Sequence, residues 1–184
     1  MNRARTDYST VVVSEFKFTP YWVLGFIEGE GSFYVRNNKY FTLGFGLGQS
    51  VKDLSLMQEL RAYLAKDLPI KYGVVVYPKA VSLVETKDEF GVVSSISISI
   101  GNISYFKNVF IPFLDSMIWR SKKWSDYQDW MTILQIKELD YHKTEAGIKV
   151  INLLINQMNL RRLTTSISKY ESTVSLEVLA RIVS

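Results

Sequence analysis

A segment of twelve residues constrains the fold of this chain more than any other. It reads WVLGFIEGEGSF and spans Trp22–Phe33, directly after Thr19 and Pro20, a helix-capping residue and a residue that favours the first turn. Gly25 and Gly29 lie four residues apart, on one side of the predicted helix, and each costs roughly 1 kcal/mol relative to alanine. Small residues at this spacing let a second backbone approach closely, as they do in paired membrane helices. We predict a short helix, from residue 20 to about 29, that packs against another helix.

Two carboxylates follow at the end of this helix. Glu28 and Glu30 lie where the helix dipole is negative, which disfavours a carboxylate by roughly 0.3–1 kcal/mol. Two acids beside exposed carbonyl groups suit a cation. Packing two copies of the helix through Gly25 and Gly29 would bring two such ends together, and that cluster of oxygen ligands would hold divalent metals between the strands of a nucleic acid. The alternative is a solvated helix end that leads into a turn.

The rest of the pattern predicts an α+β domain. Hydrophobic residues at every second position predict strands at Ser32–Arg36 and Tyr40–Gln49, joined by a turn at 37–39. The further elements are expected to be a helix from Ser50 to about Leu64, strands at Lys71–Tyr77 and Ser94–Ile100 on either side of an extended loop or strand continuation at 79–91, and helices at 102–113, 122–139 and 144–159. This order, α-β-β-α-β-β-α and then further helices, predicts a four-stranded antiparallel sheet backed by helices on one face. Residues 1–18 are expected to form an N-terminal arm, 19–163 one domain, and 164–184 a C-terminal tail.

Composition narrows the chemistry. The chain has 184 residues and a net charge of +4, which is compatible with a polyanionic partner. It contains no cysteine and one histidine, His142, so a metal site must rest on carboxylates, which select hard cations such as Mg²⁺. No apolar run reaches the roughly 20 residues that span a bilayer, and the first ten residues lack the layout of a secretory signal. We therefore expect an intracellular protein with no membrane partner.

The run from Val23 to Gly31, followed by Ser32 and Phe33, resembles the sequence motif of the LAGLIDADG homing endonucleases. The motif occurs once, as in the single-motif, homodimeric members of that family, and the order of elements agrees from about residue 19 to 160. The resemblance implies the fold of that family and a site-specific enzyme that hydrolyses both strands of double-stranded DNA. It also implies a homodimer on a long, nearly palindromic site, with Mg²⁺ as cofactor and Mn²⁺ as a substitute.

The resemblance implies roles for five residues. Glu30 matches the acid that ligates the catalytic metals, assisted by the backbone carbonyl of Gly31, whereas Glu28 matches an acid that is usually structural. Gln49 matches a polar residue that organises water around the metals, and Lys122 matches a basic residue near the active site. Gln49 and Lys122 also have ordinary interpretations. Gln49 would then cap the strand-to-helix turn, and Lys122 would be a solvated charge at a helix start.

The open face of the sheet is expected to lie along the major groove of DNA. Residues at two-residue spacing in phase with Glu30 are expected near bases, and two lysines are expected on phosphates; these DNA-binding residues are Tyr34, Arg36 and Asn38, and Lys71 and Lys79. The chain departs from the family pattern on the second strand, where Gly44, Gly46 and Gly48 offer no side chains for base contacts.

Other functions are possible at this point. Some proteins of the same family bind intron RNA and assist its splicing without cutting DNA. The chain also resembles the C-terminal half of a two-motif enzyme, because residues 18–22 resemble the entry to a second repeat. A third alternative is an α+β domain that merely dimerises through a notched helix. Genes of this family are often found in introns of organelle genomes, so the resemblance implies a mitochondrion or another organelle.

Overall fold

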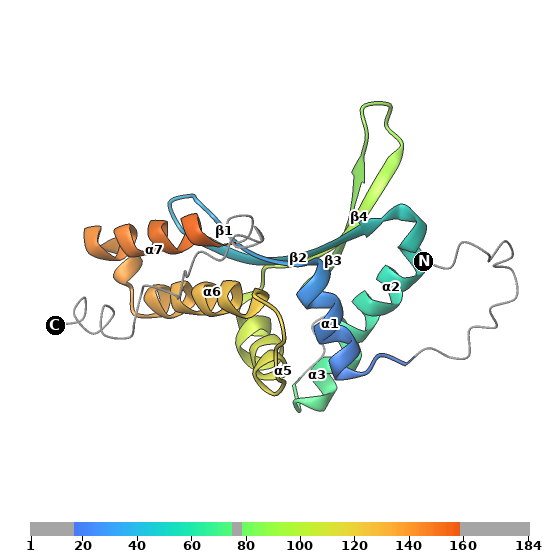
Figure 1. Cartoon of the computed structure of the whole chain (residues 1–184), viewed down its shortest axis with the longest axis horizontal. Helices are drawn as coiled ribbons and strands as arrows, with labels where there is room; N and C mark the ends of the chain where they lie inside the picture. The colour runs from blue at the N-terminus through green and yellow to red at the C-terminus, as the bar shows by residue number, and fades with distance from the viewer. Residues whose placement is uncertain (1–16, 75–78, 159–184) are drawn as a thin grey trace, which may run out of the picture.

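The computed structural model describes residues 17–74 and 79–158, which form one sheet with helices packed against it (Figure 1). Nearly all of the predicted arm and all of the predicted tail lie outside the described residues. The strands are β1 (Gly31–Arg36), β2 (Thr42–Ser50), β3 (Val81–Lys87) and β4 (Val93–Ile100). The α-helices are α1 (Pro20–Glu30), α2 (Leu54–Ala62), α3 (Leu68–Lys71), α4 (Ile103–Tyr105), α5 (Ile111–Asp115), α6 (Lys123–Glu138) and α7 (Glu145–Gln157). The segments η1 (Val51–Asp53) and η4 (Tyr141–Lys143) are 3₁₀-helical, and η2 (Tyr63–Asp67) and η3 (Phe106–Phe110) are π-helical.

The sheet consists of two hairpins placed side by side. Its strand order is β1-β2-β4-β3, and every neighbouring pair is antiparallel. Phe45 pairs with Phe33 on one side and with Ile100 on the other, and all three side chains are fully buried on the helix-covered face. Alternate residues therefore face the helices, as period-two burial requires. The prediction of a four-stranded antiparallel sheet backed by helices is confirmed.

Helix α1 begins as its sequence predicts. The side-chain oxygen of Thr19 accepts a hydrogen bond from the backbone N–H of Trp22, at 3.2 Å, and Pro20 occupies the first helical position. Val23, Leu24 and Ile27 are buried against the sheet. The helix ends one residue later than predicted, at Glu30, and continues directly into β1.

The predicted strand at 71–77 is wrong in its described part. The helix that starts with α2 continues through η2 and α3 to Lys71, and Tyr72 and Gly73 then form a turn. The helical run persists because Leu60, Leu64 and Leu68 continue one buried stripe, each at most 1% exposed. The π-helical segment is anchored by the Tyr105 hydroxyl, which donates a 2.6 Å hydrogen bond to the carbonyl oxygen of Leu64.

The third strand is β3, which lies in the segment that was predicted to be a loop or strand continuation. Its inward positions Val81 and Leu83 are apolar, but Glu85 and Lys87 follow at the same phase. The alternation fades because the far half of the β3–β4 hairpin extends beyond the helices; Figure 1 shows it rising on the side of the sheet opposite α1, α2 and α6. Sequence periodicity cannot identify a strand that has no core to face.

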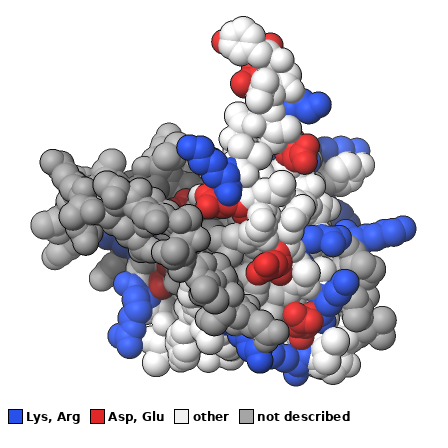
Figure 2. Space-filling model, turned by 90° about the vertical axis from the view of Figure 1, so that its right-hand side faces the viewer, with Lys and Arg blue, Asp and Glu red and all other residues white. Residues whose placement is uncertain are grey.

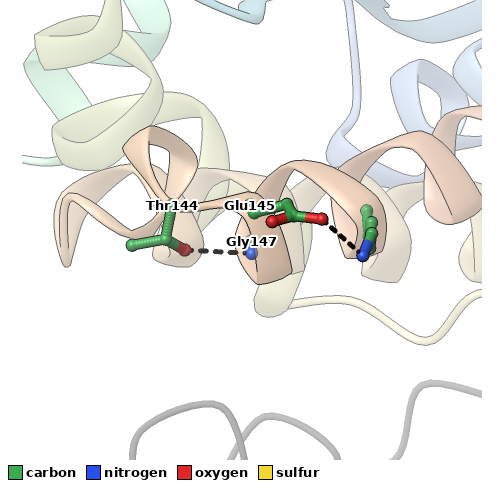
Figure 3. A network of polar contacts seen from close by, with 4 residues as sticks. Thr144, Glu145 and Gly147 are labelled. Atoms are coloured by element: carbon green, nitrogen blue, oxygen red, sulfur yellow. Dashed lines mark hydrogen bonds and ion pairs between the residues drawn. The ribbon is translucent and has the colours of Figure 1, made fainter.

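The remaining helices follow the prediction closely. The predicted helix at 102–113 is the run α4–η3–α5, and the Asn102 side chain accepts a hydrogen bond from the Tyr105 N–H at 2.8 Å. Helix α7 starts with a matching cap, in which Thr144 Oγ1 accepts from the Gly147 N–H, and an ion pair joins Glu145 to Lys149 one turn later (Figure 3). None of the helices in the described residues is both long enough and apolar enough to cross a bilayer.

Candidate functional site

The end of α1 joins β1 without an intervening loop. The Gly31 N–H donates a hydrogen bond to the carbonyl oxygen of Ile27 and thereby closes the helix. A β-carbon at Gly31 would lie 2.5 Å from that oxygen and 3.0 Å from the ring of Phe45. Position 31 therefore requires glycine for space, in addition to the metal-ligating carbonyl that the resemblance implies. The position of the acids depends on this junction.

Glu30 stands at this junction as the last residue of α1. Its side chain is exposed, and in the described part of the chain no hydrogen bond or ion pair reaches its carboxylate. Both carboxylate oxygens are therefore available to an external ligand. Such a carboxylate, held at the C-terminal end of a helix, has the donor chemistry that a hard cation requires.

Glu28 is engaged in quite a different way. Its Oε1 atom accepts two hydrogen bonds, from the backbone N–H of Arg120 at 2.7 Å and from that of Ser121 at 2.6 Å. These donors lie more than 90 positions away in the sequence, in the α5–α6 loop (residues 116–122). Among the described residues the two acids of the motif therefore differ: Glu28 binds a distant loop, whereas Glu30 has no partner.

Lys122 ends the α5–α6 loop at the cap position of α6. Its side chain is exposed, whereas the neighbouring Lys123 is only 9% exposed. Trp119 packs the loop against α6, because its ring stacks on that of Tyr127 with centroids 5.3 Å apart. Burial, and then a 2.8 Å hydrogen bond donated to Asp115, raise the pKa of Tyr127. Of the two lysines, Lys122 is the one whose ammonium group a solvent-borne ligand can reach.

Gln49 lies near the end of β2, on the side of the sheet that bears α1. It comes two residues after Leu47, the partner of Gly31, and its own partner on β4 is the buried Ile96. Because side chains two residues apart share a face, Gln49 points to the helix side, at the end of the strand where α1 meets the sheet. The side chain is partly buried. Gln49 and Glu30 thus belong to the same corner of the fold.

One side of α1 has no partner in the described residues. A β-carbon at Gly25 or at Gly29 would meet no atom within 4 Å. Beside Gly25 lies an open hollow of about 370 Å³, lined by Tyr21, Leu24, Gly25, Glu28, Ile118 and Arg120. Tyr21 and Ile118 are each 62% exposed, although both are large and apolar. The glycine notch that the sequence indicates is therefore open, and it continues onto the α5–α6 loop, which sequence reasoning did not find.

The open face of the sheet is covered in part by Tyr34. Its ring lies on Gly44, where a β-carbon would overlap it, and it also approaches Gly46. Filling bare glycines with an aromatic side chain of the neighbouring strand is a known means of stabilising sheets. The glycine strand is thus less bare than the sequence indicates. Along β4 and β3 the same face carries mainly hydroxyl side chains, namely Ser82, Thr86, Ser95, Ser97 and Ser99.

Two predicted DNA-contact residues, Asn38 and Lys71, lie off the strands on which they were expected, whereas Lys79 lies within the segment that was expected to be a loop or strand continuation. Asn38 is in the turn after β1, where its Oδ1 accepts from the Tyr40 N–H at 3.0 Å, so it does not continue the row of Tyr34 and Arg36. Lys71 ends α3, with its ammonium group 5.6 Å from the centroid of the Tyr63 ring, and is not on a strand. Lys79 is exposed in the turn before β3. Arg36 does lie at the end of β1, exposed and about 6.0 Å from the Tyr34 ring.

The projecting hairpin carries an acidic tip that sequence reasoning also missed. Its turn is closed by Asp88, whose Oδ1 accepts from the N–H groups of Phe90 and Val92 at 2.9 Å each, and by Gly91 at φ +79°. Phe90 is 82% exposed beside Glu89. Figure 2 shows the hairpin as mostly uncharged, with acidic side chains near its end.

One chain by itself supplies few metal ligands. In the residues that the structure describes, no three His, Cys, Asp or Glu side chains gather closely enough to hold a metal ion. Glu30 nevertheless fits a hard cation such as Mg²⁺, which commonly takes one or two carboxylates and fills its other positions with water and substrate phosphate. A second acidic helix end across the open face of α1 would double the ligand set.

Comparison with known proteins identifies similar sequences. The model of a family described as LAGLIDADG endonuclease matches residues 23–134. The chain is 28% identical over 155 residues to the uncharacterized mitochondrial protein RF1 of Saccharomyces cerevisiae, covering 79% of this chain and 32% of that protein. It is 28% identical over 145 residues to the probable intron-encoded endonuclease 3 of Neurospora crassa, covering 75% of this chain and 24% of that protein. The chain thus spans a third or less of the length of these relatives.

Solved structures show the same fold. The meganuclease I-SmaMI, bound to uncleavable DNA, is 28% identical with a TM-score of 0.59, covering 77% of this chain and 45% of that chain. The homing endonuclease I-TnaI is 22% identical with a TM-score of 0.59, covering 91% of this chain and 99% of that chain. At 22% identity the second likeness concerns the fold alone. This chain therefore spans less than half of I-SmaMI and nearly all of the I-TnaI chain.

Proposed function

The chain belongs to the LAGLIDADG endonuclease family, and from this premise we propose that it is a site-specific, divalent-metal-dependent DNA endonuclease. The observation that carries the proposal is the end of α1, where Glu30 is exposed and unbound in the described residues while Glu28 fastens the neighbouring loop. Within the described residues, the Glu30 carboxylate makes no bond that would stabilise the fold. It is therefore available to ligate a cation.

Glu30 and the backbone carbonyl of Gly31 would hold the cation, with Mg²⁺ as the natural ion and Mn²⁺ as a substitute. The cation would polarise the scissile phosphate and make water a stronger nucleophile at neutral pH. Lys122, exposed at the cap of α6, would stabilise the negative charge that develops on the phosphate. Gln49, on the α1 side of the sheet, would orient the attacking water by hydrogen bonding.

DNA would lie on the open face of the sheet. I-SmaMI, which shares the fold, has been solved on DNA, and the β3–β4 hairpin rises on this same side of the sheet. Arg36, Tyr34 and the serines of β4 would contact bases or sugar and phosphate, while Lys79 would contact phosphate from the turn before β3. Asn38 and Lys71 are weaker candidates in view of where they lie. Serine hydroxyls pair with any base, so we expect the sheet to discriminate bases less sharply than a row of Arg and Gln side chains would.

The active enzyme would contain two motif helices packed face to face. The open notch at Gly25 and Gly29 supports a second helix at this place, and two-fold symmetry would make the target nearly palindromic. We favour a second copy of this chain as the partner. The other arrangement, in which the chain is one half of a two-motif protein, is supported by its coverage of less than half of I-SmaMI. The names of the relatives support an organelle, such as the mitochondrion, as the compartment.

A second candidate function is binding of intron RNA to assist splicing, without cleavage. The observation that favours it is the open face itself, which in its described part offers hydroxyl groups and glycines but only one arginine, Arg36. Nucleic-acid binding that is intact in EDTA, with no cutting at any metal concentration, would identify this function.

The test of nuclease activity is cleavage of a library of randomised DNA sites in Mg²⁺, followed by sequencing of the cut ends. We expect the wild type to cut a discrete, nearly symmetric set of sites, and Glu30→Gln to cut at least about 100-fold more slowly, because the amide cannot replace the anionic ligand. Glu59→Gln, which removes an exposed carboxylate from α2, is the matched control and should cut normally. Equal rates for Glu30→Gln and the wild type would contradict the proposal.

A further inference from the structure

The hydrogen bonds of Glu28 join the ends of two helices that the mechanism uses separately. Glu28 lies in the last turn of α1, two residues before the proposed metal ligand Glu30. Its partners, the N–H groups of Arg120 and Ser121, immediately precede Lys122 at the cap of α6. The residue proposed to hold the cation and the residue proposed to stabilise the transition state are thus connected through one carboxylate.

The electrostatic setting explains why the acid is tolerated. A carboxylate in the last turn of a helix faces the negative end of that helix dipole, which is unfavourable. The same carboxylate of Glu28 is bonded to the two residues that precede Lys122, the cap of α6, and so lies near the positive end of that helix dipole. Bonds from a backbone N–H to a carboxylate are among the stronger hydrogen bonds of a protein. Two charge-assisted hydrogen bonds from the α5–α6 loop therefore offset the unfavourable position of Glu28 at the end of α1.

The second half of the α5–α6 loop is bonded to the start of α6, where Ser121 Oγ accepts from the Lys123 N–H at 3.2 Å and the Ser121 carbonyl oxygen accepts from the Trp124 N–H at 3.3 Å, and Glu28 joins it to α1. Its first half is fastened to α5, since the Ser116 N–H donates to Pro112 and the Trp119 side chain donates to Leu114. In the described residues, Glu28 is the only acceptor for the N–H groups of Arg120 and Ser121. Without it, the two residues before Lys122 would lose both of these hydrogen bonds.

We propose that Glu28 is a positioning residue, which holds the α5–α6 loop so that Lys122 is set relative to the acidic end of α1. This inference rests on the proposed nuclease function and deepens it. Misplacement of a catalytic group by about 1 Å can cost roughly 100-fold in rate, so the loss of the anchor should be visible in the cleavage step. DNA affinity should change little, because Glu28 itself contacts no DNA in this arrangement.

Three substitutions of Glu28 distinguish the effect of its side-chain length from the effect of its charge. Glu28→Gln keeps the length of the side chain and a carbonyl oxygen that can accept both N–H groups, so it should cleave within about threefold of the wild type. Glu28→Asp keeps the charge but is one methylene too short for bonds of 2.6–2.7 Å, and Glu28→Ala has no acceptor; both should slow single-turnover cleavage roughly 10-fold to 100-fold. If Asp preserved activity and Gln destroyed it, Glu28 would be acting by its charge, as a metal ligand, and the proposal would be overturned.

A double-mutant cycle tests whether the effect passes through Lys122. If Glu28 acts only by placing that lysine, Glu28→Ala should add little to the loss already caused by Lys122→Ala. Multiplicative losses would show independent roles and contradict the proposal. DNA affinity measured in EDTA should stay within about twofold for every variant, with Glu59→Ala as the control; a loss of rate that follows a loss of affinity would also count against it.

Amide hydrogen exchange tests the anchor without reference to cleavage. In Glu28→Ala, the amides of Arg120 and Ser121 should exchange at least about 10-fold faster, while the amides of α7 stay protected. Glu28→Gln should retain the protection, which keeps the test valid if the alanine variant folds poorly. Unchanged exchange at both amides would refute the anchor. If the wild type cut no DNA, both the proposed function and the catalytic role of Glu28 would be wrong. The exchange rates of the Arg120 and Ser121 amides would still test whether Glu28 anchors the loop.

Discussion

The residues of the motif at 23–31 have different structural roles although they lie in one short segment. Gly25 and Gly29 face open space, Gly31 is enclosed, Glu28 is bound to a loop and Glu30 is unbound in the described residues. This short run of glycines and acids therefore combines four structural roles: a notch, a helix-to-strand junction, a loop anchor and a proposed ligand. Substitutions within it should have effects that differ in kind, and not only in size.

Gly31→Ala should destabilise the folded protomer by roughly 1–3 kcal/mol, because the added methyl group would press on the Ile27 carbonyl oxygen and the Phe45 ring. Urea unfolding monitored by tryptophan fluorescence measures this. Gly101→Ala is the matched control outside the notch of α1, where a β-carbon meets nothing within 4 Å in the described residues, and it should cause no such loss. Equal stability of Gly31→Ala and the wild type would show that the junction relaxes freely.

Tyr127 should make the fold sensitive to alkaline pH. Burial and the hydrogen bond to Asp115 raise its pKa in the folded state above the unfolded value of 10.0. A raised folded pKa contributes stability that is fully present below pH 10 and is lost as pH rises beyond it, because the unfolded state releases the proton first. The free energy of unfolding should therefore fall above pH 10 in the wild type.

Tyr127→Phe should reduce that fall. At pH 7 the variant should be about 0.5–1.5 kcal/mol less stable, since it lacks the hydrogen bond to Asp115. Above pH 10 its stability should approach that of the wild type, with a remaining slope from Tyr105, whose pKa burial also raises. Denaturant titrations between pH 8 and 11 provide the comparison, and parallel curves for the two proteins would contradict the assignment.

At the scale of elements, the two hairpins of the sheet serve different purposes. The β1–β2 hairpin lies over the helices, and its outer face is partly closed by Tyr34 on the glycines of β2. The β3–β4 hairpin leaves the helices and ends in an acidic, aromatic tip. A tip of this charge would be repelled by phosphates, so we expect it to meet base edges or to stand clear of the duplex.

Neutralising the tip should strengthen DNA binding if the hairpin approaches the duplex. The double variant Glu85→Gln/Glu89→Gln leaves Asp88 to close the turn, and at low salt it should bind DNA roughly threefold more tightly. The gain should shrink as salt is raised, because screening removes the repulsion that the variant relieves. Fluorescence anisotropy at several salt concentrations measures both effects. Affinity equal to that of the Glu59→Gln control at every salt concentration would place the tip away from the DNA.

At the scale of the whole molecule, the open face of α1 is the main question. Within the described residues, α1 of a single protomer presents Glu30 without a partner, a glycine notch and a hollow flanked by Tyr21 and Ile118. All of these would be explained by a second motif helix against α1. The proposed catalytic centre is thus incomplete in one chain and would be formed by assembly.

Gly25→Ala should separate folding from assembly. In the described residues of one protomer the methyl group meets nothing within 4 Å, so alanine, the better helix former, should raise the stability of the protomer by up to about 1 kcal/mol. In a pair of closely packed helices the same methyl group would hold the backbones apart. Sedimentation at micromolar concentration should show the wild type as a dimer and Gly25→Ala as more dissociated, with Ser55→Ala on α2 as the control. A wild type that sediments as a monomer would contradict the homodimer.

The sequence alone determined whatever depends on neighbours in the chain. The Thr19 cap, the alternation of β1 and β2, the notch at Gly25 and Gly29 and the α+β order all follow from contacts within a few residues, where spacing and geometry are nearly equivalent. The sequence did not predict β3, because much of that strand faces no core and so lacks a regular hydrophobic alternation. It also did not predict that the helix starting with α2 continues to Lys71, as its buried stripe of leucines requires.

The tertiary structure alone decided which distant groups meet. Glu28 and Ser121 are 93 positions apart, and Tyr34 lies over Gly44 only because of the register of two strands. Such pairs have no periodic signature, since loop closure places no constraint on residue type at either end. The sequence could therefore identify the acids, whereas only the folded chain shows that Glu28 is bound and that Glu30 has no partner among the described residues.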